Sequence, residues 1–101
     1  MIMIEENIFY NYVYLDPRKP GDYNYGDIHF DFEPFYIGKG CSNRMFQHLY
    51  EKEETTYNPH KVRIINKIKK AGLEPVILKI YEKIDERTSL ENEIILSHKG
   101  F

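Results

Sequence analysis

The sequence lacks several features that would decide its class at once. It has no tryptophan and a single cysteine, Cys41, which excludes an internal disulfide and a cysteine-based zinc site. No apolar run approaches the roughly 20 residues of a membrane-spanning helix. The first residues, MIMIEENIFY, are acidic and lack the basic region of a secretory signal. We therefore expect an intracellular, cytoplasmic protein with no membrane partner.

The sequence also lacks an excess of positive charge. Its 14 lysine and arginine residues stand against 16 aspartate and glutamate residues, which gives a net charge of −2. A protein that grips nucleic acid without sequence preference is usually basic overall. A nucleic-acid partner would therefore require local positive charge or a separate DNA-binding domain.

Tyrosine, in contrast, is abundant, with nine residues in a chain of 101. A phenol combines an apolar body with a polar tip, so many of these side chains should lie between core and surface. A chain of this length predicts a single domain, residues 1–101, with one hydrophobic core.

Three segments have the composition of strands. Residues 8–15 are rich in aromatic and branched side chains, and in a strand at residues 74–83 the side chains of Val76, Leu78 and Ile80 would share one face. Between residues 28 and 38 a short strand is optional, and a firmer one is expected at 35–38. Proline and glycine punctuate residues 16–27, which predicts turns there.

Helical spacing indicates three helices. One covers residues 42–52, with Ser42 or Asn43 as its cap, and a second runs from Pro59 to Gly72 after the cap residue Asn58. The last helix begins near Asp85 or Thr88, with an apolar side formed by Leu90, Ile94 and Ile95. The order β-β-α-α-β-α predicts an α+β fold, in which helices flank a small three-stranded antiparallel sheet.

The first candidate site lies at the start of the 42–52 helix. Gly38 and Gly40 flank Lys39, and such glycines let the backbone approach a ligand, although they also occur in ordinary turns. Arg44 and His48 share one helix face, since they are four residues apart. Arginine can clamp a phosphate and histidine can relay a proton, but both also suit a solvated surface.

Glu91 offers a second candidate. It ends the segment TSLE, residues 88–91, which matches the capping-box pattern at a helix start. It also shares a helix face with Ile95, which would place it at the rim of the buried side, where a carboxylate could hold magnesium. Glu86 and Glu93 are the solvated alternatives.

Two strand tyrosines complete the candidates. Tyr14 and Tyr36 could serve as cross-strand packing residues, which is the ordinary role of such pairs. A catalytic tyrosine would need a nearby cation to lower its pKa, and Lys39 or a metal ion is the candidate.

Together these motifs resemble the GIY-YIG nuclease family over about residues 9–98. YVY at 12–14 stands at the first tripeptide and YIG at 36–38 at the second, and SLENEIIL at 89–96 resembles the last motif, which favours Glu91 over Glu93. The longer signature YLDPR…PFYIGKG looks closest to phage and homing-endonuclease-like members. The chain departs from the family in Tyr12, which replaces a glycine, and in the long insert 17–35 between the tripeptides.

The resemblance implies a fold and a chemistry. It implies hydrolysis of DNA phosphodiester bonds with a single Mg²⁺ or Mn²⁺ ion. Glu91 would hold the ion, Arg44 would neutralise phosphoryl charge, and a tyrosine would act on the attacking water. The residues implied in catalysis are Tyr14, Tyr36, Lys39, Arg44 and His48, and those implied in substrate binding are Gly38, Gly40, Asn58 and His60.

Other functions stay open at this point. The same fold could serve as a catalytically weak or inactive module that binds nucleic acid or regulates another protein, and a nuclease of RNA is a third reading. The resemblance also makes a phage-encoded enzyme acting in a bacterial host an option. The chain ends at Phe101, before a further asparagine that family members often have, which leaves open a separate DNA-binding domain outside it. A homodimer partner could supply a second cut, although nothing in the sequence demands one.

Overall fold

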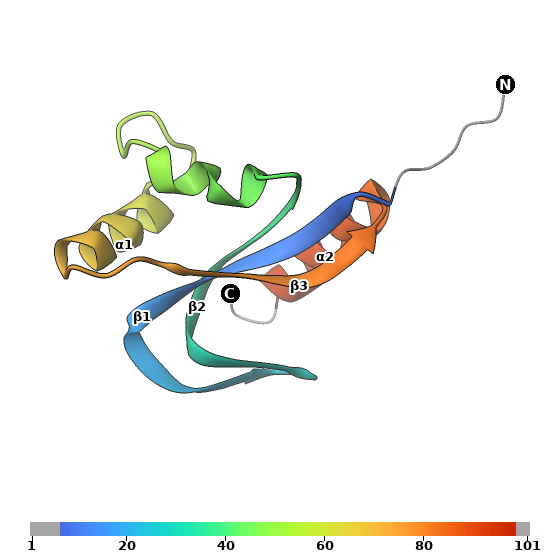
Figure 1. The fold of residues 1–101 in the computed structure, drawn as a ribbon, viewed down its shortest axis with the longest axis horizontal. Coiled ribbons are helices and arrows are strands. Elements are labelled where there is room, and N and C mark those ends of the chain that lie inside the picture. The colour runs from blue at the N-terminus through green and yellow to red at the C-terminus, as the bar shows by residue number, and fades with distance from the viewer. Residues whose placement is uncertain (1–6, 99–101) are drawn as a thin grey trace, which may run out of the picture.

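A computed structural model describes residues 7–98. In this part the chain forms one sheet with helices on both sides (Figure 1). The elements are β1 (Phe9–Tyr25), β2 (Ile28–Cys41), the 3-10 helix η1 (Arg44–Tyr50), α1 (Pro59–Lys70), β3 (Val76–Ile84) and α2 (Glu86–Ser97). The strand order is β2-β1-β3, and both pairings are antiparallel. The predicted α+β class and element order are confirmed. Residues 1–6 and 99–101 of the predicted domain lie outside the described part.

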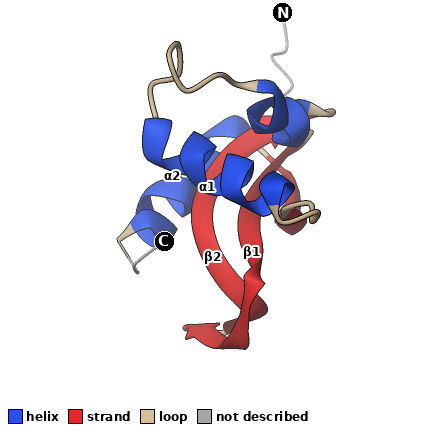
Figure 2. Ribbon diagram, turned by 90° about the vertical axis from the view of Figure 1, so that its left-hand side faces the viewer, coloured by secondary structure: helices blue, strands red, loops and turns tan. Residues whose placement is uncertain are grey.

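The long insert is the first difference from expectation. Residues 17–35 do not form a loop, because β1 continues to Tyr25 and β2 returns from Ile28 around a turn at Gly26. Gly26 has a φ of 64°, a conformation that favours glycine. The prolines are accommodated by shifts of register between Asp16 and Tyr23. The result is a long hairpin whose far end extends beyond the helices (Figure 2).

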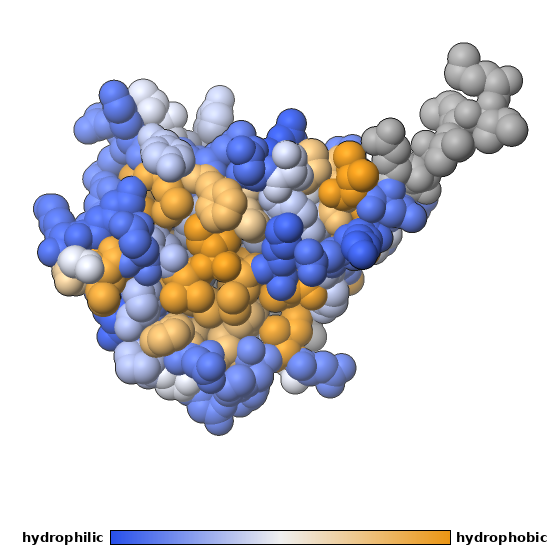
Figure 3. All heavy atoms as spheres, viewed as in Figure 1, coloured by the Kyte–Doolittle hydropathy of each residue, from blue (hydrophilic) through white to orange (hydrophobic). Residues whose placement is uncertain are grey.

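Alternation along β1 divides the interior into two parts. Tyr10, Tyr12 and Tyr14 pack with Ile65 of α1 on one face of the sheet. Val13 and Leu15 pack on the other face, against Leu96 of α2. Since successive strand residues point to opposite faces, one short segment supplies the centre of both clusters. Viewed from the side of Figure 3, hydrophobic residues gather over the sheet and hydrophilic residues surround them.

Buried Asn11 fixes α2 against the sheet. Its side-chain amide donates to the carbonyl oxygens of Gly38 (3.2 Å) and Ser89 (2.8 Å). Ser89 is fully buried as a consequence, whereas Leu90, Ile94 and Ile95 are exposed. The prediction that these three residues form the inner side of the helix is therefore wrong. The inner face of α2 instead carries Ser89 and Leu96.

The helix caps settle a second alternative. Asp85 caps α2, since its carboxylate accepts a hydrogen bond from the backbone N–H of Thr88 (3.1 Å). Glu91 thus lies well inside the helix, and the capping-box interpretation of residues 88–91 is wrong. Asn58 caps α1 as expected, by accepting from the backbone N–H of Lys61 (3.1 Å).

The helix expected at residues 42–52 is instead the 3-10 helix η1. Neither Ser42 nor Asn43 caps it with a side chain, and Ser42 has a φ of 56°. Two phenols explain the tighter winding. Tyr10 donates to the Ser42 carbonyl (2.8 Å) and accepts from the Met45 N–H (3.2 Å), while Tyr14 donates to the Met45 carbonyl. These bonds draw backbone groups toward the sheet and away from an α-helical ladder. Among the helices described, none has the length and apolar character that crossing a membrane requires.

Candidate functional site

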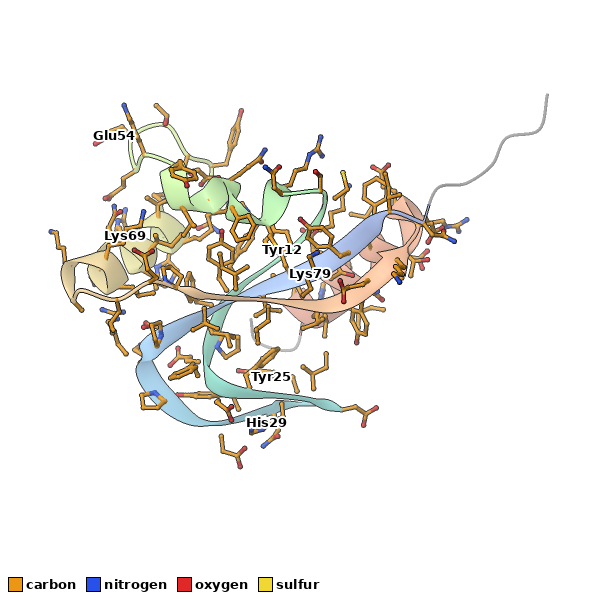
Figure 4. The ribbon with its side chains drawn as sticks, viewed as in Figure 1. Tyr12, Tyr25, His29, Glu54, Lys69 and Lys79 are labelled. Carbon is orange, nitrogen blue, oxygen red and sulfur yellow. The ribbon has the colours of Figure 1, made fainter. Side chains whose placement is uncertain are left out.

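The tyrosine cluster, formed by Tyr10, Tyr12, Tyr14 and Tyr36, lies on the face of the sheet that η1 covers (Figure 4). Tyr14 pairs with Tyr36 across the β1–β2 ladder, and Tyr12 pairs with Gly38. The ring centroids of Tyr12 lie 6.0 Å from Tyr14 and 6.2 Å from Tyr36. A Cβ on Gly38 would come within 2.5 Å of the Tyr12 ring. Glycine is therefore required here for the aromatic packing itself.

His48 of η1 completes this tyrosine cluster. Its Nε2 lies 2.6 Å from the Tyr12 hydroxyl, and its ring centroid lies 4.6 Å from that of Tyr36. Its other nitrogen, Nδ1, lies 2.9 Å from Glu51 Oε1 and 2.5 Å from Lys61 Nζ. The predicted involvement of His48 is thus accompanied by two charged partners that sequence reasoning did not select.

Burial controls the protonation of the cluster. It is the main reason why the pKa of Tyr12 and of Tyr14 is raised far above the ordinary 10.0. Burial also raises the pKa of Tyr36, with Glu93 adding to the effect and a hydrogen bond from Tyr12 opposing it. Burial and then the charge of Lys61 lower the pKa of His48 from 6.5. The imidazole is therefore neutral at neutral pH.

Glu93 is the carboxylate of α2 that acts electrostatically on the tyrosines. It lies between Ser89 and Leu96 in helical spacing, it is half-buried, and its charge raises the pKa of both Tyr12 and Tyr36. Burial raises the pKa of Glu93 itself, and the charge of Lys39 opposes this. Among the described residues, none donates a hydrogen bond to its carboxylate.

Glu91 lies elsewhere. Its side chain is 58% exposed and pairs with exposed Arg87, one turn away, at 3.2 Å. The expected rim position for Glu91 is wrong, because the Asn11–Ser89 bond sets the rotation of α2. The sequence signal for the buried face of α2 was the spacing of Ser89, four positions before Glu93, and Leu96, three positions after it.

Lys39 and Arg44 differ in their surroundings. The Lys39 ammonium pairs with Glu86 Oε1 at 3.2 Å. Its positive charge also opposes the rise that burial causes in the pKa of Glu93. Its side chain shares the sheet face of Asn11, so the expected role beside a tyrosine is not supported. Arg44 is exposed at the start of η1, and no described residue pairs with its guanidinium. A Cβ on Gly40 would lie 3.2 Å from Arg44 Cβ, so the two residues are neighbours.

The start of α1 contributes a different residue from those expected. Asn58 is engaged as a helix cap, and His60 is exposed. The side chain that α1 sends into the cluster is that of Lys61, which is buried. An ammonium at a buried helix position was not visible from the apolar pattern.

The side chains of the site offer few ligands to a divalent cation. Within residues 7–98, no three histidine, cysteine or acidic side chains lie close enough to form a ready metal cluster. In the described part of the chain, Glu93 is a half-buried carboxylate that receives no hydrogen bond from another side chain. Magnesium is commonly bound through one or two carboxylates, with water and substrate phosphate completing its shell. The residues therefore fit one hard cation held by a single protein ligand.

Comparison with known proteins gives one finding. A family model described as the LEM-3-like GIY-YIG domain matches residues 9–98, which is most of the chain. A search of curated proteins found no match, and a search of solved structures found none. The match spans both tyrosine strands, η1 and α2. It gives no support to the expected closeness to phage and homing-endonuclease-like members.

Proposed function

The chain belongs to the LEM-3-like GIY-YIG domain family, whose domains are in general nucleases, and from this premise we propose a specific activity. In this proposal the protein is a divalent-metal-dependent endonuclease that hydrolyses phosphodiester bonds in DNA. The observation that carries the proposal is the half-buried Glu93 carboxylate, whose charge acts on Tyr12 and Tyr36, together with the exposed Arg44 at the start of η1, with which no described residue pairs.

Glu93 would hold the cation, Mg²⁺ or Mn²⁺. A bound cation would polarise the phosphate and stabilise the leaving oxygen. Arg44 would bind the phosphate with its planar fork and neutralise charge as it grows on the phosphoryl oxygens. Its exposure is consistent with a group that meets its partner only when DNA is bound.

Tyr36 is the tyrosine we assign to the attacking water. The Tyr14 hydroxyl donates a hydrogen bond to the Met45 carbonyl, so Tyr14 is held by the backbone of η1. Tyr36 is half-buried, and it receives a hydrogen bond from Tyr12 that favours its ionised form. Its ionised form would accept a proton from water as the water attacks phosphorus.

The alternative of a weak or inactive module has one observation in its favour. Burial raises the pKa of Tyr36, so the free protein holds this phenol protonated at neutral pH. A cation near Glu93 would oppose that effect, since Glu93 is the next largest cause of the raised pKa. Metal-dependent cleavage therefore separates the two functions.

The experiment uses supercoiled plasmid and three proteins. Wild type, Glu93→Gln and Glu91→Gln are incubated with MgCl₂, MnCl₂ or EDTA. Wild type and Glu91→Gln should nick the plasmid with metal and not with EDTA, while Glu93→Gln should lose at least about 100-fold in rate, because even indirect partners of a metal cost 10–100-fold.

Three outcomes would count against the proposal. No metal-dependent nicking by wild type would favour the binding module, and cleavage of RNA but not DNA would change the substrate. Normal activity of Glu93→Gln with loss in Glu91→Gln would return the metal to the residue expected from sequence. A cytoplasmic setting, a phage origin and a DNA-binding domain or homodimer partner stay predictions.

A further inference from the structure

Lys61 is a buried cation with an unusual set of neighbours. Lysine is almost never fully buried unless it is paired, and here the side chain is 4% exposed. Its ammonium lies 3.0 Å from Glu51 Oε2, 2.5 Å from His48 Nδ1 and 4.6 Å above the Tyr36 ring. An ion pair with Glu51 alone would not require the imidazole contact. The contact therefore calls for its own explanation.

The proton positions follow from the chemistry of the partners. An ammonium has three donors and no acceptor, so Nδ1 of His48 must present its lone pair to Lys61. Burial keeps the imidazole neutral, and a neutral ring carries only one proton. That proton must then lie on Nε2, from where it is donated to the Tyr12 hydroxyl oxygen over 2.6 Å.

This arrangement sets which group donates each hydrogen bond in the cluster. Since the Tyr12 oxygen accepts from His48, the Tyr12 proton is left to be donated onward to Tyr36. Without Lys61, Nδ1–H would instead donate to Glu51 Oε1, which is 2.9 Å away. Nε2 would then accept the Tyr12 proton, and Tyr36 would lose its donor.

We propose that Lys61 is a positioning residue of the nuclease site, which selects the Nε2–H tautomer of His48 and so directs the Tyr12 hydroxyl toward Tyr36. The catalytic consequence rests on the proposed function, whereas the tautomer does not. Lys61 touches neither phosphate nor water in this role. It acts through His48.

The first test is spectroscopic and needs no DNA. The full chain is labelled with ¹⁵N-histidine, and its four histidines are resolved by NMR above the pKa of His48. The His48→Gln variant identifies the His48 signals by their loss. Wild type should carry its proton on Nε2, and a proton on Nδ1 would overturn the proposal even if no variant folds.

Two variants of α1 extend the test. Lys61→Met keeps an apolar stem of similar length and should move the proton to Nδ1, toward Glu51. Lys67→Met, at an exposed position of the same helix, should leave the tautomer unchanged. A folded Lys61→Met protein that keeps Nε2–H would contradict the proposal. Glu51→Gln should keep Nε2–H, because Lys61 stays in place.

The third measurement is cleavage kinetics. Lys61→Met should lower kcat by about 10–100-fold, as loss of an indirect partner usually does, with KM nearly unchanged. Lys67→Met should show no fall in kcat. If Lys61→Met changes the tautomer of His48 but keeps a normal kcat, Lys61 has no role in catalysis and that part of the proposal is wrong. If wild type does not cleave, the proposed function fails, and the NMR result still decides the role of Lys61.

Discussion

Gly38→Ala should expose how tightly the tyrosine cluster is built. The added Cβ would lie 2.5 Å from both Cζ and the hydroxyl oxygen of Tyr12, closer than real Cβ contacts allow. Tyr12 cannot retreat easily, since its ring lies 6.0 Å from those of Tyr10 and Tyr14 and its hydroxyl contacts His48. Either the ring or the strand must move.

The magnitude can be worked from this geometry. Overpacking of a core costs about 1–3 kcal/mol. Replacing glycine by alanine returns about 0.4–1 kcal/mol by restricting the unfolded chain. The midpoints of these ranges leave a net loss of about 1.3 kcal/mol for Gly38→Ala, or roughly 5–10 °C in Tm for a domain of this size.

Gly40→Ala is the matched control. Gly40 is buried on the same strand and the same sheet face, but its added Cβ would lie 3.2 Å from Arg44 Cβ and 3.5 Å from the Tyr10 hydroxyl. Small adjustments relieve such contacts, so its Tm should stay within a few degrees of wild type.

The assay is thermal unfolding followed by circular dichroism, together with plasmid cleavage well below both Tm values. Gly38→Ala should also cleave more slowly than Gly40→Ala, because displacement of Tyr12 breaks its contact with His48. Equal Tm values for the two variants would refute the packing of Tyr12 on Gly38.

Two further predictions concern Arg44 and His48. Arg44→Lys should leave stability within about 0.5 kcal/mol of wild type, as exposed substitutions do, and should lower kcat/KM by roughly 100-fold, because lysine lacks the planar fork. Near-normal cleavage would argue against a phosphate clamp. For His48, burial and Lys61 hold the pKa below 6.5, so the unfolded chain binds the proton first as pH falls. The stability contributed by neutral His48 is present above pH 6.5 and should decline below it. Urea midpoints of wild type should therefore fall on acidification relative to those of His48→Gln, and a relative rise would show the sign to be wrong.

Lys61 marks the limit of what a sequence pattern predicts about the candidate site. Strand composition predicts the first half of β1, although β1 continues to Tyr25 where turns were expected, and helical spacing predicts α1. Spacing within α1 predicts which apolar residues are buried. It cannot reveal that a lysine beside them is buried as well, because the partners that compensate its charge lie on η1 and β2.

The sequence by itself determined the α+β class, the order of the elements, the cap at Asn58, and the family to which the chain belongs. These properties depend on local propensity and on motifs, which need no knowledge of distant contacts. The tertiary structure decided the rotation of α2, because the Asn11–Ser89 bond outweighs the apolar spacing of the helix. That rotation leaves Glu91 in solvent and Glu93 half-buried. The phenols of β1 likewise turned the next segment into the 3-10 helix η1, since hydrogen bonds from a neighbouring strand compete with the helix's own.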